Sequence, residues 1–138
     1  MRKLTKIEQR NADALVDAAL FHVTRTILNK NIQDCNVALR DLLKREGVID
    51  YDDLKAGDKV TLEGVYADGA ETKISAYRAK TRGDKRIWFN SLKNYADAGD
   101  IMALVIRSGK LVIQNVTKGV AVAVFVVNFA EPVIKMAF

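Results

Sequence analysis

The chain has 138 residues, a formal net charge of +5 and one cysteine, Cys35. This length suits one domain with its own core, and 49% hydrophobic with 28% charged residues excludes a disordered chain. The single cysteine excludes an internal disulfide. The first residues are too polar for a signal peptide, and the longest apolar run, 120–127, is too short to cross a membrane. We therefore expect a cytoplasmic protein with no membrane partner.

The first fifty residues are predicted to be helical. Apolar side chains recur at helical spacing in two adjacent rows that run from Ile7 to Ile27, and Thr5 with Glu8 fits a capping box at the start. We expect a break at 29–31 and a second helix over about 33–46, in which Cys35 is a buried apolar residue. Two apolar rows imply that the first helix is covered by the rest of the chain or by a second subunit.

After residue 50 the pattern becomes that of strands. Alternation at 59–63 and 72–77 surrounds a hairpin signal, and a short strand at 86–89 precedes a brief helix at 91–96. Further strands are expected at 101–106, 111–116, 120–127 and 133–138. The sequence thus predicts an α+β fold, with two N-terminal helices in a segment 1–50. A roughly seven-stranded, mostly antiparallel β-barrel with one short helix then fills residues 51–138.

A weak internal repeat lies within the predicted barrel. Gly57-Asp58 and Gly99-Asp100 each open an alternating strand. Glycine permits a turn that other residues adopt only with strain, and the aspartate can accept backbone N–H bonds there. The alternative is that these are two unrelated Gly-Asp turns.

The charge of the chain is concentrated in one segment. Residues 78–98 hold six Lys or Arg against two acids, a balance of +4, so the rest of the chain carries about +1. If the strand continues past Tyr77, alternation directs three of the cations to one face, and a turn at Gly83-Asp84 folds two more beside them. Such a cluster suits phosphates, and arginine can also read guanine. The predicted nucleic-acid-binding residues are Arg78, Lys80, Arg82, Lys85, Arg86, Asn90 and Lys93.

Trp88 lies within this basic segment and has two interpretations. It can stack on an exposed base, or it can anchor the core between Ile87 and Phe89, which is the interpretation we favour.

Catalytic signatures are weak in this sequence. His22 has no partner at metal-ligand spacing, and no phosphate loop or nucleophile motif is present. Glu71 with Lys73 only faintly resembles a metal-dependent nuclease site. We expect no enzyme activity, no cofactor and no metal.

The Gly-Asp turns and residues 85–106, an aromatic strand followed by a short helix, Gly-Asp and an apolar strand, resemble a B3-type DNA-binding pseudobarrel. Such domains occur in plant transcription factors and in target-reading modules of some restriction enzymes. The resemblance covers about residues 54–116, and AbrB-like and double-psi barrels share its second part. It implies a β-barrel that reads duplex DNA, and no catalytic residue transfers with it.

The residues and the resemblance together favour a nucleic-acid-binding protein, with duplex DNA as the expected partner. The alternative is a structural or assembly protein of a phage or defence system that forms a homo-oligomer. In that case the basic loop and the apolar C-terminal strand would make subunit contacts.

Overall fold

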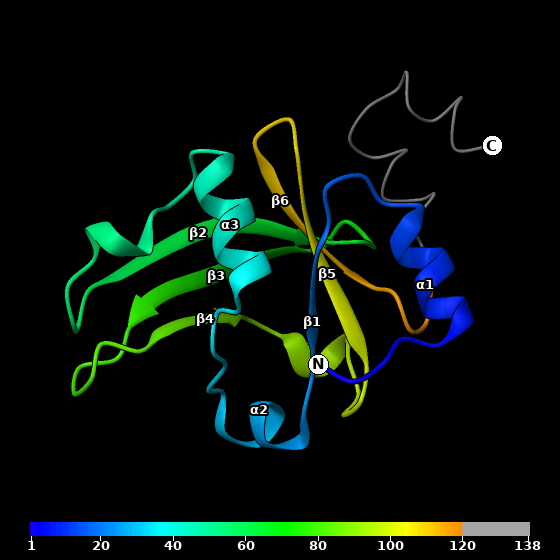
Figure 1. The fold of residues 1–138 in the computed structure, drawn as a ribbon, viewed down its shortest axis with the longest axis horizontal. Helices are drawn as coiled ribbons and strands as arrows, with labels where there is room; N and C mark the ends of the chain where they lie inside the picture. Colours follow the sequence, from blue (N-terminus) through cyan, green and yellow to red (C-terminus); the bar gives the residue numbers. More distant parts are fainter. Residues whose placement is uncertain (120–138) are drawn as a thin grey trace.

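The computed structural model describes residues 1–119. Three short α-helices surround a mixed β-sheet, which curls toward a half-barrel (Figure 1). The helices are α1 (Lys6–Asp13), α2 (Arg25–Lys30) and α3 (Val37–Arg45), with 3₁₀ turns η1 (Tyr51–Asp53) and η2 (Leu92–Asn94). The strands are β1 (Ala19–His22), β2 (Lys59–Tyr66), β3 (Glu71–Arg78), β4 (Lys85–Phe89), β5 (Ile101–Arg107) and β6 (Lys110–Asn115).

The six strands lie in the order β1-β5-β6-β2-β3-β4. Neighbours pair antiparallel except β2 and β6, which pair in parallel through Gly64↔Leu111 to Tyr66↔Ile113. This parallel step joins two antiparallel groups, β1-β5-β6 and β2-β3-β4. The second group, the β2–β3–β4 arm, carries the basic segment at its far end (Figure 1).

The prediction of a long first helix is wrong. α1 begins at the expected capping box, in which Thr5 accepts from the Glu8 backbone N–H and the Glu8 carboxylate accepts from the Thr5 N–H, but it ends at Asp13. Asp17 then takes a left-handed conformation (φ 56°), and β1 follows, paired with β5. Two apolar rows also describe a strand that is buried on one face and half-buried on the other, and here sheet pairing prevails over helical spacing.

The predicted seven-stranded barrel is likewise corrected. The residues from 1 to 119 form six strands in an open, curled sheet, and one of these strands comes from the segment that was expected to be wholly helical. The strands expected between 59 and 116 are present, while those at 120–127 and 133–138 lie outside the described residues. The α+β class is confirmed.

The Gly-Asp repeat is structural. Gly57 and Gly99 have φ values of 90° and 98°, and Asp58 and Asp100 each accept the backbone N–H three residues earlier, at 2.9 Å. Each pair also clips a neighbouring strand end: Gly57 and Asp58 bond the backbone of Arg78, and Gly99 and Asp100 bond that of Val23 in the same way. The two halves of the sheet therefore share one local device.

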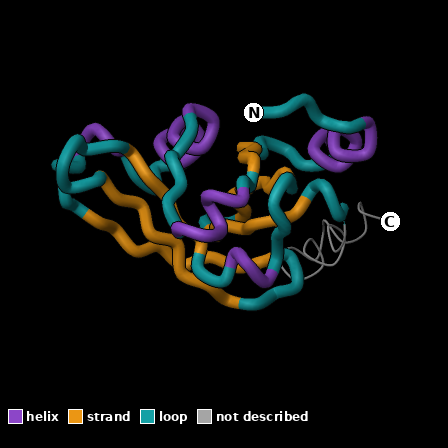
Figure 2. The backbone as a smooth tube through the Cα atoms, turned by 90° about the horizontal axis from the view of Figure 1, so that it is seen from below, coloured by secondary structure: helices purple, strands orange, loops and turns teal. Residues whose placement is uncertain are grey.

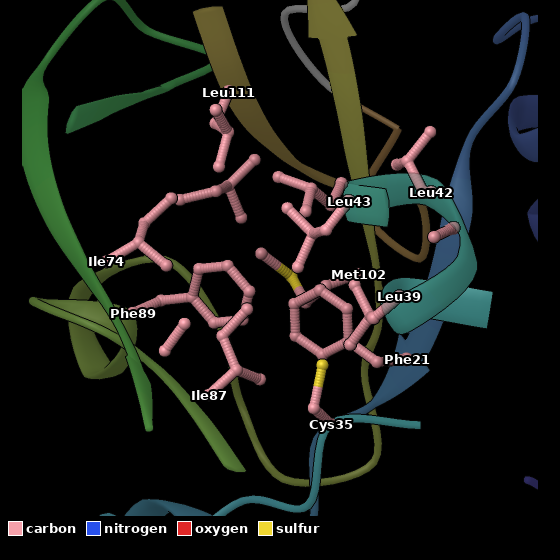
Figure 3. Close-up of a cluster of buried hydrophobic side chains, with 14 of the residues drawn as sticks. Phe21, Cys35, Leu39, Leu42, Leu43, Ile74, Ile87, Phe89, Met102 and Leu111 are labelled. Atoms are coloured by element: carbon pink, nitrogen blue, oxygen red, sulfur yellow. The ribbon is translucent and has the colours of Figure 1, made fainter. Parts of the chain in front are cut away.

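The main core fills the concave side of the sheet. Helix α3 contributes Leu39, Leu42 and Leu43, which are essentially inaccessible to solvent. They face Phe21, Ile74, Ile87, Phe89 and Met102 from the strands (Figure 3). The rings of Phe21 and Phe89 stack, with centroids 4.9 Å apart. A second, smaller cluster on the other face of β5 and β6 explains why β5 is buried on both sides.

An ion pair between the half-buried Arg2 and the buried Glu8 ties the N-terminal segment to the sheet. Arg2 donates to both carboxylate oxygens of Glu8 and to the carbonyl of Gly99, and Thr117 donates to Glu8. The bonds from Arg2 hold the pKa of the nearly inaccessible Glu8 carboxyl well below its ordinary value of 4.5.

No helix within residues 1–119 reaches the length and apolarity that crossing a membrane requires. Helix α3, the longest of them, has 9 residues.

Glu8→Gln is expected to lower Tm at pH 7 by roughly 5 °C, because it removes the charge that Arg2 and Thr117 bind. A lowered folded-state pKa stabilises the protein above pH 4.5, and this contribution is lost as the pH falls. The difference in Tm between the two proteins should therefore shrink in acid. Thermal unfolding followed by circular dichroism measures it, with Glu46→Gln on the exposed end of α3 as the control. Equal Tm values for Glu8→Gln and the unaltered protein at pH 7 would show that the ion pair between Arg2 and Glu8 does not stabilise the fold.

Cys35 is expected to resist thiol reagents in the folded protein. It is 1% exposed, and burial raises the pKa of its thiol from 9.0 to about 11. At pH 8 the thiolate fraction should fall roughly 100-fold, so Ellman's reagent should react at least that much more slowly than in denaturant. Reaction at the denatured rate would show that this side of the core is open.

Candidate nucleic-acid interface

A tight loop between β3 and β4 forms the end of the arm. Antiparallel pairing of Arg78 with Lys85 leaves residues 79–84 to reverse the chain. The N–H of Ala79 donates to the carbonyl of Asp84, and the N–H of Gly83 donates to that of Ala79. Gly83 has φ 71°, a conformation that L residues rarely adopt. The loop is therefore held in one shape by its own backbone.

The first Gly-Asp turn lies directly beside this loop. The N–H of Gly57 donates to the carbonyl of Arg78, and the N–H of Arg78 donates to that of Asp58, both at 3.0 Å. A β-carbon on Gly57 would lie 3.6 Å from Cγ of Lys80, so the two loops pack closely. Backbone hydrogen bonds thus fix the positions of the backbone that carries the basic side chains.

A surface hollow of about 600 Å³ lies between these two loops. Its lining combines the ends of three strands with the 79–84 loop, and among residues 1–119 Asp84 is its only acid. We call it the cationic hollow, because five cations line it: Lys59, Arg78, Lys80, Arg82 and Arg86.

The carboxylates near the cationic hollow neutralise it only in part. Asp84 lies 3.1 Å from Arg86 and 3.8 Å from Arg82, and Asp34 lies 3.9 Å from Arg86. Within residues 1–119, no carboxylate lies within ion-pair distance of Lys59, Arg78 or Lys80. The buried Nε atoms of Arg78 and Arg86 also lack a hydrogen-bond acceptor among these residues. The hollow thus has charge that no carboxylate in residues 1–119 neutralises, and an anion can pair with it.

Lys85 is not part of the cationic hollow. It does not line the hollow, and it alternates with Arg86 along β4, so it starts on the face of Ile87 and Phe89, which its partner Arg78 shares. There its ammonium group lies 3.4 Å from Asp52 of η1. Neighbours in the sequence are therefore separated by the sheet.

Asn90 and Lys93 lie at the other end of β4. Both side chains are exposed, and neither lines the hollow. The Asn90 carbonyl accepts from the hydroxyls of Tyr66 (2.5 Å) and Thr72 (2.9 Å), so its backbone has a structural role. The seven predicted residues therefore divide into four that the fold brings together and three that it places elsewhere.

Lys59 belongs to the hollow but was missed by the sequence analysis. It reaches the site because β2 pairs with β3, which in turn pairs with β4, giving the row Lys59↔Tyr77↔Arg86. The alternation in the sequence predicted β2 and β3 themselves, but it did not give the register that places Lys59 beside Tyr77.

Trp88 is half-buried rather than a central core residue. It contacts the main core cluster, yet it alternates with Ile87 and Phe89, both of which are inaccessible to solvent. Its ring therefore belongs to the outer face of the arm.

The residues considered for catalysis do not assemble into a metal site within residues 1–119. No three His, Cys, Asp or Glu side chains there are close enough to hold a metal ion. Lys73 pairs with Glu63 on the neighbouring strand rather than with Glu71. His22 lies in β1, not in a helix as expected.

No family model, no characterised protein and no solved structure matches the chain. The resemblance to B3-type domains therefore stays a prediction from the sequence.

Proposed function

We propose that this protein binds nucleic acid and that the cationic hollow holds backbone phosphates. The single observation that carries the proposal is the convergence of five cations around one surface hollow with one acid among them. Phosphate groups are the anions that Arg and Lys clusters of this kind bind most readily, through charge-assisted hydrogen bonds.

A polymer fits this site better than a lone small anion. Lys80 and Arg82 project from an exposed loop, while Arg78 and Arg86 lie deeper, with buried Nε atoms. Cations at two depths around one hollow can follow a chain of phosphates, and each contact releases condensed counterions. The resemblance to B3-type pseudobarrels, which rests on sequence alone, favours the same class of ligand and names duplex DNA.

The assembly role remains the alternative. It depended mainly on the apolar C-terminal segment, which lies outside the described residues. Light scattering after size exclusion separates the two functions: a large homo-oligomer that has no affinity for nucleic acid would favour assembly.

Lys80→Ala/Arg82→Ala should weaken binding and lower its salt dependence. Both residues are exposed on the loop, so the fold should tolerate the change. Each lost phosphate contact reduces the slope of log K against log salt by roughly 0.7 to 0.9. Fluorescence anisotropy with labelled single-stranded and duplex DNA at several ionic strengths measures this slope.

The matched control is Lys6→Ala/Arg10→Ala on α1. It removes the same charge from an exposed helix far from the arm (Figure 1). We expect it to retain the unaltered slope. Equal losses in the two double variants would show that net charge, and not the hollow, drives binding.

Asp84→Asn should strengthen binding by roughly two- to fivefold, because it removes the acid that partly neutralises Arg82 and Arg86. A gain in affinity is not produced by misfolding, so this variant complements the losses above. The same anisotropy titration measures it, with Asp13→Asn at the end of α1 as the control. Unchanged or weaker binding by Asp84→Asn would argue against phosphate in the hollow.

A further inference from the structure

The outer face of the β2–β3–β4 arm carries two aromatic side chains beside the cationic hollow. Register places Lys59, Tyr77 and Arg86 in one row across the three strands. The next row is Thr61, Ser75 and Trp88. Tyr77 and Trp88 are therefore diagonal neighbours on adjacent strands, about 7–8 Å apart at their backbones, which is close enough for them to form one surface.

This outer face is partly exposed in the part of the chain that the structure describes. The buried residues of β3 and β4, such as Ile74, Ile87 and Phe89, point to the opposite side, where η1 and α3 pack. Figure 2 shows the helices on that one side of the arm. Thr61 is exposed, and Ser75, Tyr77 and Trp88 are only partly buried.

The charge around the two rings also favours an anionic polymer. Lys59 and Arg86 flank Tyr77 in its own row, and the hollow continues from that row. The acids nearby are already occupied: Glu63 pairs with Lys73, and Asp34 lies 3.9 Å from Arg86. A ligand on this face thus meets aromatic rings next to Lys59, which has no carboxylate within ion-pair distance in residues 1–119, and Arg86, which Asp84 and Asp34 neutralise only in part.

We propose that this face is a stacking platform and that the ligand is a single-stranded segment of nucleic acid. Bases would stack on Trp88 and Tyr77 while the neighbouring phosphates enter the cationic hollow. Bases within a duplex are stacked on one another and cannot lie flat on a protein ring, so a platform of this kind selects unpaired strands. This inference rests on the proposed function and replaces the expected duplex with a single strand.

Trp88 provides a direct test, because it is the only tryptophan in the chain. The unaltered protein is titrated with oligothymidylate, with a duplex of equal length and with inorganic polyphosphate, which has charge but no bases. Binding is followed by competition anisotropy, and stacking is followed by tryptophan fluorescence. We expect oligothymidylate to quench Trp88, while polyphosphate competes for the site without quenching.

The outcomes separate the two proposals. Binding of oligothymidylate without quenching, or equal quenching by the duplex, overturns the stacking platform and leaves the phosphate-binding function intact. Absence of binding by all three ligands overturns the proposed function itself.

A variant gives a second readout. Trp88→Leu should weaken oligothymidylate binding about tenfold or more and leave polyphosphate binding unchanged. Trp88→Phe, which keeps an aromatic ring, should restore most of the affinity. Equal losses for both ligands would assign Trp88 a purely structural role, and the fluorescence titration of the unaltered chain decides the matter if Trp88→Leu does not fold.

Discussion

Antiparallel pairing of β3 with β4 is the constraint on which the candidate site depends. It sets Arg78 directly opposite Lys85, and two like charges facing each other destabilise a strand pair by themselves. On the core face the same register packs Ile74 and Ala76 against Ile87 and Phe89 in a buried cluster. Burial of that face offsets the repulsion at the end of the arm.

The two Gly-Asp turns show how a cationic site arises on an ordinary scaffold. Both turns clip a strand end through the same backbone bonds, one at Val23 and the other at Arg78. Val23 is fully buried among apolar side chains, whereas Arg78 lines the hollow. The same pair of backbone hydrogen bonds thus holds a buried valine, Val23, in one half of the sheet and an arginine that lines the hollow, Arg78, in the other. The chemistry of the site comes from the side chains and not from the fold.

The parts of the fold that depend on neighbouring residues were predicted from the sequence. The Thr5–Glu8 capping box and the hairpins around residues 68 and 108 are examples, because each is decided within a few residues. Long-range pairing decides the rest. It made a strand of 19–22, aligned β2 with β6, brought Lys59 to the hollow and sent Lys85 to the other face. Periodicity gives the faces of a strand but not its neighbours, so four of the five cations in the hollow were predicted from the sequence but Lys59 was not.

The most direct test of phosphate binding in the cationic hollow observes its guanidinium groups during binding. Arginine Nε–Hε signals in ¹⁵N-correlated NMR spectra would be followed while an oligonucleotide is added. The account predicts that the signals of Arg78 and Arg86, whose Nε atoms lack an acceptor within residues 1–119, shift on binding. The signal of Arg2, which already donates to Gly99, and that of Arg10 on α1 should stay in place. Binding that leaves Arg78 and Arg86 unchanged, or that shifts Arg10 equally, would contradict it.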